Sequence, residues 1–157
     1  MPVTRRDRLV AAPREDVWRV VSDPHQLARW WPKVLRVEDV QERRRGSGSS
    51  WTQVLETRSG RPVRAEVRCL YSKDHHVHAW RQQVDGTPFA KVLRASETRI
   101  ELEDADGGTR VSLEMDQRMR GLSRLGGWMV KRATGAQLDE ALDGLHRAVA
   151  GSGAPAN

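Results

Sequence analysis

Cysteine is scarce in this sequence, and so are phenylalanine and tyrosine, with one residue of each among 157. The single Cys69 excludes an intrachain disulfide, so the fold has to rest on a packed core, and a cytoplasmic location is expected. The N-terminus, MPVTRRDRLV, has basic residues but no apolar run after them, which argues against a secretory signal peptide. No stretch approaches the roughly 18 apolar residues of a membrane-spanning helix, so membrane insertion is not expected.

Long stretches of charge of one sign are also missing. The 27 basic and 21 acidic residues leave a net charge of +6, but segments such as EDVQERRR mix both signs closely. Interleaved charges are typical of a solvated surface, whereas a nucleic-acid interface usually gathers its basic residues on one face. We therefore expect no nucleic-acid partner.

Tryptophan, by contrast, is abundant, with six residues. Indoles often line cavities and interfaces because their N–H groups need partners, although they also serve as large core residues. Trp30 and Trp31 stand side by side in SDPHQLARWWPKV, with Leu27 one turn earlier and Pro32 directly after. This spacing predicts a short helix with one apolar face. That face either plugs a core or forms one wall of a cavity.

The pattern of apolar residues predicts strands in the middle of the chain and helices near both ends. A strand over residues 3–11 precedes two short helices, one opening at Pro13 and one ending at Pro32. Strand segments are then expected at residues 34–42, 51–57, 63–71, 76–84, 89–103 and 111–115. The fifth segment is either two strand pieces or one strand bent by a bulge near Ala95 and Ser96.

After Gly121 the apolar period becomes helical, which predicts one long helix over residues 122–150. Its second half carries a clear apolar stripe that includes Leu138, Leu142 and Leu145. Its first half contains several glycines, which weaken a helix and leave space beside it. The last residues, 151–157, are expected to form a flexible tail.

Three segments then carry a family resemblance: AAPREDVWRVVSDPHQLARWWPKV (residues 11–34), DGGTRVSLEM (residues 106–115) and LDEALDGLHRAV (residues 138–149). With the order of elements, they resemble the START/polyketide-cyclase-like (SRPBCC) superfamily. The resemblance implies an α+β helix-grip fold, in which a curved antiparallel sheet of six or seven strands surrounds the long C-terminal helix. Two short helices would follow the first strand. Residues 1–150 would form a single ligand-binding domain with a cavity between sheet and helix.

Two expected strands could present aromatic and amide side chains to such a cavity. Trp51 and Gln53 share one strand face by alternation, unless Val54 points inward and Gln53 lies in solvent. On residues 76–84, Trp80 shares a face with Gln82, and we take that face as the inner one although neither face is cleanly apolar. The candidate ligand-binding residues are Trp30, Trp31, Trp51, Gln53, Trp80, Gln82, Phe89, Met115, Trp128 and Met129.

Groups that could carry out chemistry are few. Arg132 is one catalytic candidate, since it could present a cation to a carbonyl or enolate, unless it extends into solvent beside Lys131. His78 is the other. His75, His76 and His78 lie close in sequence, but nothing convincingly completes a three- or four-ligand set, so no metal is expected. Without a phosphate-binding loop or a nucleophile motif, no cofactor is expected either.

Two functions of different classes fit these features. The first is binding of a hydrophobic, flat or aromatic small molecule in an internal cavity. The second, which the resemblance suggests, is a polyketide cyclase/aromatase that performs cofactor-free aldol cyclisation and dehydration, with Arg132, His78 or Gln53 polarising a carbonyl. Binding is favoured because no acid–base pair can be placed from the sequence. A similarity to the quinone-binding, ribosome-associated branch is disfavoured by the mixed charges, and the chain could be a monomer or a homodimer.

Overall fold

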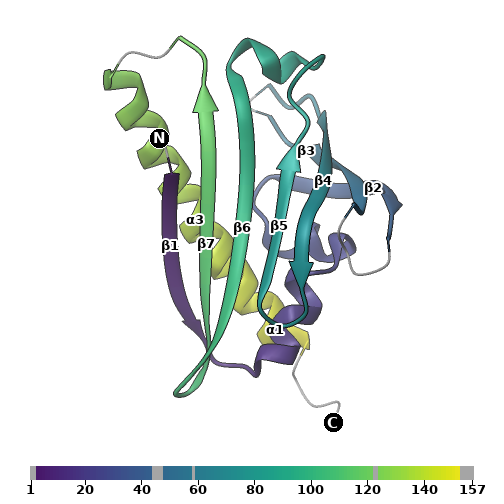
Figure 1. Ribbon diagram of the computed structural model, residues 1–157, viewed down its shortest axis with the longest axis vertical. Helices are drawn as coiled ribbons and strands as arrows, with labels where there is room; N and C mark the ends of the chain where they lie inside the picture. Colours follow the sequence, from purple (N-terminus) through teal and green to yellow (C-terminus); the bar gives the residue numbers. More distant parts are fainter. Residues whose placement is uncertain (1–2, 44–47, 58, 122–123, 153–157) are drawn as a thin grey trace.

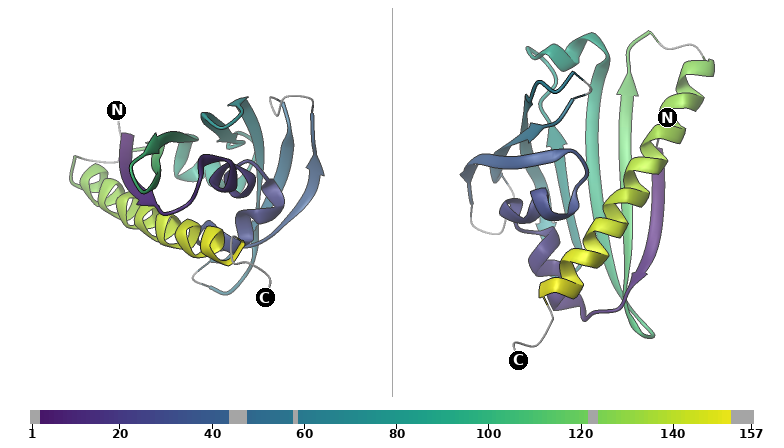
Figure 2. Two further views of the ribbon diagram at one scale, coloured as in Figure 1. Left: turned by 90° about the horizontal axis from the view of Figure 1, so that it is seen from below. Right: turned by 180° about the vertical axis from the view of Figure 1, so that it is seen from behind.

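The computed structural model describes residues 3–43, 48–57, 59–121 and 124–152. One seven-stranded sheet curves around a long C-terminal helix, and short helices follow the first strand (Figures 1 and 2). The strands are β1 (Val3–Val10), β2 (Val34–Gln41), β3 (Ser50–Leu55), β4 (Val63–Lys73), β5 (Val77–Gln82), β6 (Leu93–Ala105) and β7 (Gly108–Met119). The helices are α1 (Arg14–Val21), α2 (Leu27–Trp30) and α3 (Arg124–Ser152), with short 3-10 helices η1 (Pro24–Gln26) and η2 (Pro88–Lys91). The helix-grip α+β fold predicted from the sequence is confirmed.

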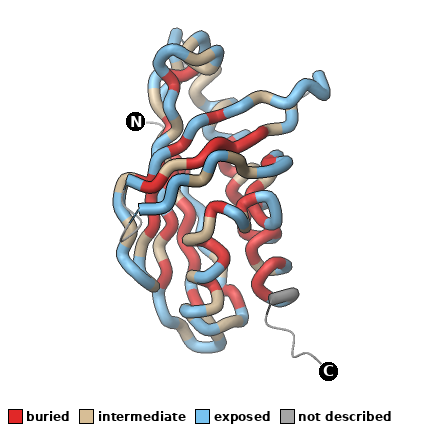
Figure 3. Tube along the Cα trace, turned by 90° about the vertical axis from the view of Figure 1, so that its right-hand side faces the viewer, coloured by how far each residue is buried: buried red, intermediate tan, exposed pale blue. Residues whose placement is uncertain are grey.

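The strands are ordered β1–β7–β6–β5–β4–β3–β2, and all neighbours are antiparallel. The chain therefore begins at one edge of the sheet, crosses to the other edge through α1 and α2, and returns strand by strand. In Figure 2, α3 lies diagonally across one face, which we call the inner face. Buried residues concentrate between that face and the helices (Figure 3).

The short helices begin and end where the local sequence requires it. Pro13 precedes α1 with a φ of −61°, and Glu15 and Asp16 place negative charge near the helix N-terminus. The Asp23 carboxylate accepts the backbone N–H of His25 at 3.0 Å, which caps η1. Trp31 leaves α2 with extended backbone, as expected for a residue before proline.

The long helix α3 packs through the stripe that the sequence predicts, and Leu138, Leu142 and Leu145 are all buried. It continues to Ser152, so the expected boundary at residue 150 is two residues short. The remainder of the expected tail, residues 153–157, lies outside the described residues, as do residues 122 and 123. Within the described ranges, no helix is long and apolar enough to cross a membrane.

Two predicted strand segments differ in detail. Residues 88–91 form η2 rather than strand, and Leu93–Ala105 is one continuous strand with an irregularity between Leu93 and Ala95. Alternation along residues 63–71 predicts that Tyr71 shares the inner face with Cys69, but Tyr71 is exposed. The register between β4 and β5 shifts between these two residues, and such a bulge reverses the alternation of side chains beyond it.

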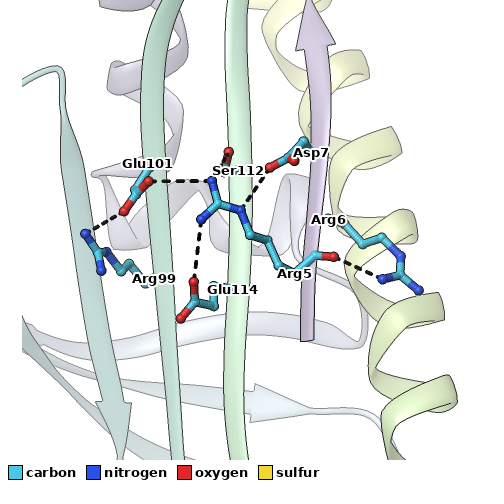
Figure 4. A network of polar contacts seen from close by, with 7 residues as sticks. All are labelled: Arg5, Arg6, Asp7, Arg99, Glu101, Ser112 and Glu114. Atoms are coloured by element: carbon cyan, nitrogen blue, oxygen red, sulfur yellow. Dashed lines mark hydrogen bonds and ion pairs between the residues drawn. The ribbon is translucent and has the colours of Figure 1, made fainter. Parts of the chain in front are cut away.

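The outer face of the sheet is charged and internally paired. Arg5 on β1 reaches across β7, where its Nη2 donates to Ser112 Oγ at 3.2 Å (Figure 4). The same guanidinium lies 3.3 Å from Asp7 and 3.8 Å from both Glu101 and Glu114. The mixed charges of the sequence thus neutralise one another on a solvated face. Exposed pairs of this kind add little stability.

Candidate functional site

A cavity of about 200 Å³ lies between the inner face of the sheet and α3. Its apolar side chains come from the residues that follow α2, from η2 and from five strands of the sheet: Trp31, Pro32, Leu55, Val67, Trp80, Phe89, Leu93 and Met115. Its uncharged polar side chains are amides and hydroxyls: Gln53, Gln82, Ser96, Thr98, Gln117 and Gln137. The site therefore combines an aromatic wall with hydrogen-bonding groups, as ligand pockets generally do.

The aromatic wall is a cluster of indoles in edge-to-face contact. The ring centroids of Trp31 and Trp80 are 5.4 Å apart at 74°, and those of Trp30 and Trp31 are 5.3 Å apart at 89°. Trp51 packs behind Trp80 with a centroid distance of 6.0 Å. Such arrangements stabilise aromatic pairs beyond their burial. Each of these indoles therefore packs against at least one other.

The polar wall contains two amides whose Nε2 atoms have no hydrogen-bond partner among the described residues. Gln53 is only 6% exposed, and its Nε2 atom is buried. The Nε2 atom of Gln82 is buried and unpartnered in the same way. Gln117 differs, since its Oε1 accepts the hydroxyl of Thr134 on α3 at 3.1 Å.

Charged residues reach the cavity only at its rim. Among the described residues that line it, Lys33 and Glu56 alone carry charge, and both are exposed. The backbone N–H of Glu56 donates to the carbonyl of Lys33 at 2.8 Å, so the two residues are neighbours. Away from this rim, the described side chains that line the cavity are uncharged.

His78 lies on the inner face, in the aromatic cluster rather than in the cavity lining. Its ring is stacked on Trp51 with a centroid distance of 6.4 Å, and its Nδ1 lies 3.2 Å from Ser72 Oγ. Burial lowers the pKa of His78 from 6.5 to about 4. The imidazole is therefore neutral at physiological pH.

Cys69 is expected to resist Ellman's reagent in the folded protein at pH 8 and to react completely once the chain is unfolded in guanidinium chloride. Burial raises the pKa of its thiol to about 11, and the reactive thiolate is therefore scarce. The chain has one cysteine, so the absorbance change reports this residue alone. Rapid stoichiometric labelling of the native protein would show that the β4 inner face is open to solvent.

Six of the ten candidate ligand-binding residues line the cavity. They are Trp31, Gln53, Trp80, Gln82, Phe89 and Met115. The face of β5 chosen as inner is correct, and the alternative that put Gln53 in solvent is wrong. Trp30 and Trp51 are buried in the core cluster, and the cavity lining does not include them.

The candidate site residues on the first half of α3 do not face the cavity, contrary to the prediction. Trp128 and Met129 are 61% and 62% exposed, and the Arg132 guanidinium lies in solvent, 5.6 Å from the Trp128 ring centroid. A helix turns about 100° per residue, so Met129 is half a turn away from the buried Leu138. Arg132 extends into solvent, which was the alternative left open by the sequence.

Gln117 and Gln137 line the cavity but were not identified from the sequence. Alternation along β7 places Gln117 on the same face as Met115, so extending the pattern by two residues would have found it. Gln137 directly precedes the buried Leu138 but gives no sequence signal of its own, because an amide on a helix usually faces water.

A larger hollow of about 1020 Å³ lies on the outer face and is open to solvent. Most of its lining residues lie on the strands, and they include the ion pair of Arg81 with Glu97. Val67 and Gln82 border both this hollow and the inner cavity. Water competes effectively for such charged groups, and few apolar side chains line the hollow. The inner cavity is therefore the better candidate for binding an apolar ligand.

Comparisons with solved structures agree with this architecture. A START superfamily protein from Mycobacterium smegmatis has a TM-score of 0.75 at 19% identity, covering 94% of this chain and 96% of that one. The Zhui aromatase/cyclase from a Streptomyces species has a TM-score of 0.73 at 17% identity, covering 94% and 92%. A protein from Thermus thermophilus has a TM-score of 0.74 at 21% identity, covering 98% and 100%. Because the sequence identities are this low, the similarity to these structures supports the fold alone.

No curated protein matches the chain closely enough to count as a relative. A family model, however, matches residues 1–150, which is almost the whole chain. Its description is polyketide cyclase / dehydrase and lipid transport. The chain, with its helix-grip fold and its cavity between sheet and long helix, therefore belongs to the polyketide cyclase/dehydrase and lipid transport family.

Proposed function

We propose that the protein binds a small, flat, hydrophobic molecule in the cavity between the sheet and α3. The observation that carries this proposal is the cavity itself, with the Trp31–Trp80 pair on one side and neutral amides on the other. Flat rings pack well against indoles in offset or edge-to-face contact. Binding of such a molecule requires only these packing surfaces and hydrogen-bonding groups, without a catalytic acid, base or cofactor.

The size of the cavity limits the ligand. Pockets for drug-sized molecules measure about 300–1,000 Å³, and this cavity of about 200 Å³ is smaller. A bicyclic ring system is therefore a better match than a long acyl chain or a tetracyclic product. Indane, a neutral bicyclic hydrocarbon, is a suitable first probe.

Binding is proposed rather than cyclisation because the catalytic candidates do not face the cavity. Arg132 lies in solvent beside Trp128, and His78 packs in the aromatic cluster with its pKa lowered by burial. A cyclase also needs an acid and a base that move protons, and the described polar side chains inside the cavity are neutral amides and hydroxyls. The similarity to the Zhui aromatase/cyclase, at 17% identity, supports the fold and leaves the reaction to experiment.

Replacing Trp80 with phenylalanine is expected to weaken indane binding about fivefold, measured by isothermal titration calorimetry. A phenyl ring covers less of the ligand, and a loss of about 1 kcal/mol corresponds to that factor. Trp128→Ser is the matched control, because this indole is exposed and outside the cavity lining. If Trp80→Phe binds indane as tightly as the wild-type protein does, Trp80 does not contact the ligand and the proposal is wrong.

A further inference from the structure

Gln53 and Gln82 have more hydrogen-bonding capacity than the protein uses. Buried side-chain polar atoms nearly always find a partner. The Nε2 atoms of both glutamines are buried, yet neither meets an acceptor among the described residues. Both side chains belong to the cavity lining. Two unused amide donors therefore border the same small space.

The two donors come from strands on either side of β4. Gln53 on β3 pairs with Ala65, and Gln82 on β5 pairs with Val67, two residues further along β4. Both therefore lie on the inner face, with β4 between them. Two strand spacings across the sheet, about 9.5 Å, and two residues along β4, about 6.7 Å, separate their backbones by about 12 Å. Two extended glutamine side chains that point toward a shared acceptor can span this gap. A ligand lying over Val67 would meet both amides.

The groups around these amides select against a charged ligand. A buried carboxylate would require a cation to balance it, and Lys33, the cationic lining residue, is exposed at the rim. The Gln117 oxygen already accepts the hydroxyl of Thr134. The two glutamine N–H donors therefore call for a neutral hydrogen-bond acceptor on the ligand. A carbonyl oxygen fits this requirement, because its two lone pairs can accept one hydrogen bond from each glutamine.

We propose that the ligand is a neutral aromatic ketone whose carbonyl oxygen accepts hydrogen bonds from the amides of Gln53 and Gln82 while its rings pack against Trp80. This inference rests on the proposed binding function and specifies its ligand class. In this proposal, Gln53 and Gln82 select for the carbonyl group, and the tryptophans supply most of the binding affinity by packing against the rings. A hydrocarbon of the same shape would bind more weakly because it leaves both donors unpaired.

Three probes of similar shape test the assignment: 1-indanone, indane and indane-1-carboxylate, each titrated into the wild-type protein by calorimetry. We expect 1-indanone to bind about tenfold more tightly than indane, and the carboxylate to bind more weakly than the ketone. Gln53→Met and Gln82→Met should each reduce that preference for the ketone over the hydrocarbon, and the double variant should abolish it. Gln83→Met is the control, since this neighbour is exposed and belongs to the outer hollow.

Thermal unfolding without ligand supplies a second readout. If the amides serve the ligand, each methionine variant should unfold about 2–4 °C higher than wild type, because a buried unpaired group has been removed. A lower unfolding temperature in both variants would show that the amides stabilise the fold and would overturn the specificity role. Equal binding of indane and 1-indanone to wild type would also overturn this inference but leave the proposed function standing. Failure of all three probes to bind would reject both.

Discussion

Replacing Gly144 with alanine is expected to lower the free energy of unfolding by about 3 kcal/mol, although alanine normally favours a helix. Gly144 lies on α3 where the helix meets the backbone of α2. A Cβ atom there would overlap with the carbonyl oxygen of Trp30 and lie 3.1 Å from its carbonyl carbon. Both of these Trp30 atoms belong to the backbone and cannot turn aside as a side chain could. The clash is therefore relieved only by moving one helix away from the other.

Gly127 on the same helix is the matched control. A Cβ atom at this position would meet nothing within 4 Å, so Gly127→Ala is expected to raise the free energy of unfolding by about 0.5–1 kcal/mol. Urea denaturation of the two variants measures both effects on one scale. A Gly144→Ala protein as stable as wild type would contradict the close approach of α2 to α3. Since Trp31 directly follows α2, the same variant should also bind indane less tightly.

Acidification from pH 6.5 to pH 4 is expected to remove about 3 kcal/mol from the free energy of unfolding through His78 alone. Burial lowers the pKa of His78 from 6.5 to about 4 in the folded protein. Between these values the unfolded chain binds a proton at this residue and the folded protein does not. Protonation therefore favours unfolding, and each pH unit is worth about 1.4 kcal/mol. The stabilising contribution of neutral His78 is fully present above about pH 6.5. It is lost as the pH falls toward 4, and below pH 4 it changes no further.

The slope of stability against pH distinguishes this effect from a general loss of packing. Urea titrations at intervals from pH 4 to pH 7 should show a steep dependence for wild type and a much flatter one for His78→Phe, whatever the absolute stability of that variant. His25→Gln, at an exposed position, should keep the wild-type slope. An unchanged slope in His78→Phe would mean that this residue does not control the pH response.

Alternation and helical periodicity were sufficient to predict most of the fold. Strands with one buried face repeat every second residue, so the buried Ala65, Val67 and Cys69 of β4 could be recognised directly. The same rule placed Gln53 beside Trp51 and Gln82 beside Trp80 on the inner face. Pro13 and the proline after Trp31 marked the limits of the short helices.

The sequence did not predict the burial of a side chain correctly where the tertiary structure overrides the local pattern. Tyr71 continues an apolar alternation, but a bulge in β4 turns it outward, and nothing in its neighbours announces the bulge. Met129 and Trp128 are apolar residues on a helix, which predicts burial only if another element covers that face. Their exposure shows that the sheet does not cover them.

Local periodicity and residue type were enough to predict the order of strands and helices and the helical contact face around Leu138. The resemblance to the START/polyketide-cyclase-like superfamily added the helix-grip arrangement and the cavity. Which polar groups lack partners, in contrast, emerged from the assembled fold. Gln53, Gln82 and Gln137 come from β3, β5 and α3, and whether their amides are paired depends on atoms distant in the chain. Hydrogen-bond satisfaction is a property of the assembled core, and the specificity proposed for this cavity depends on it.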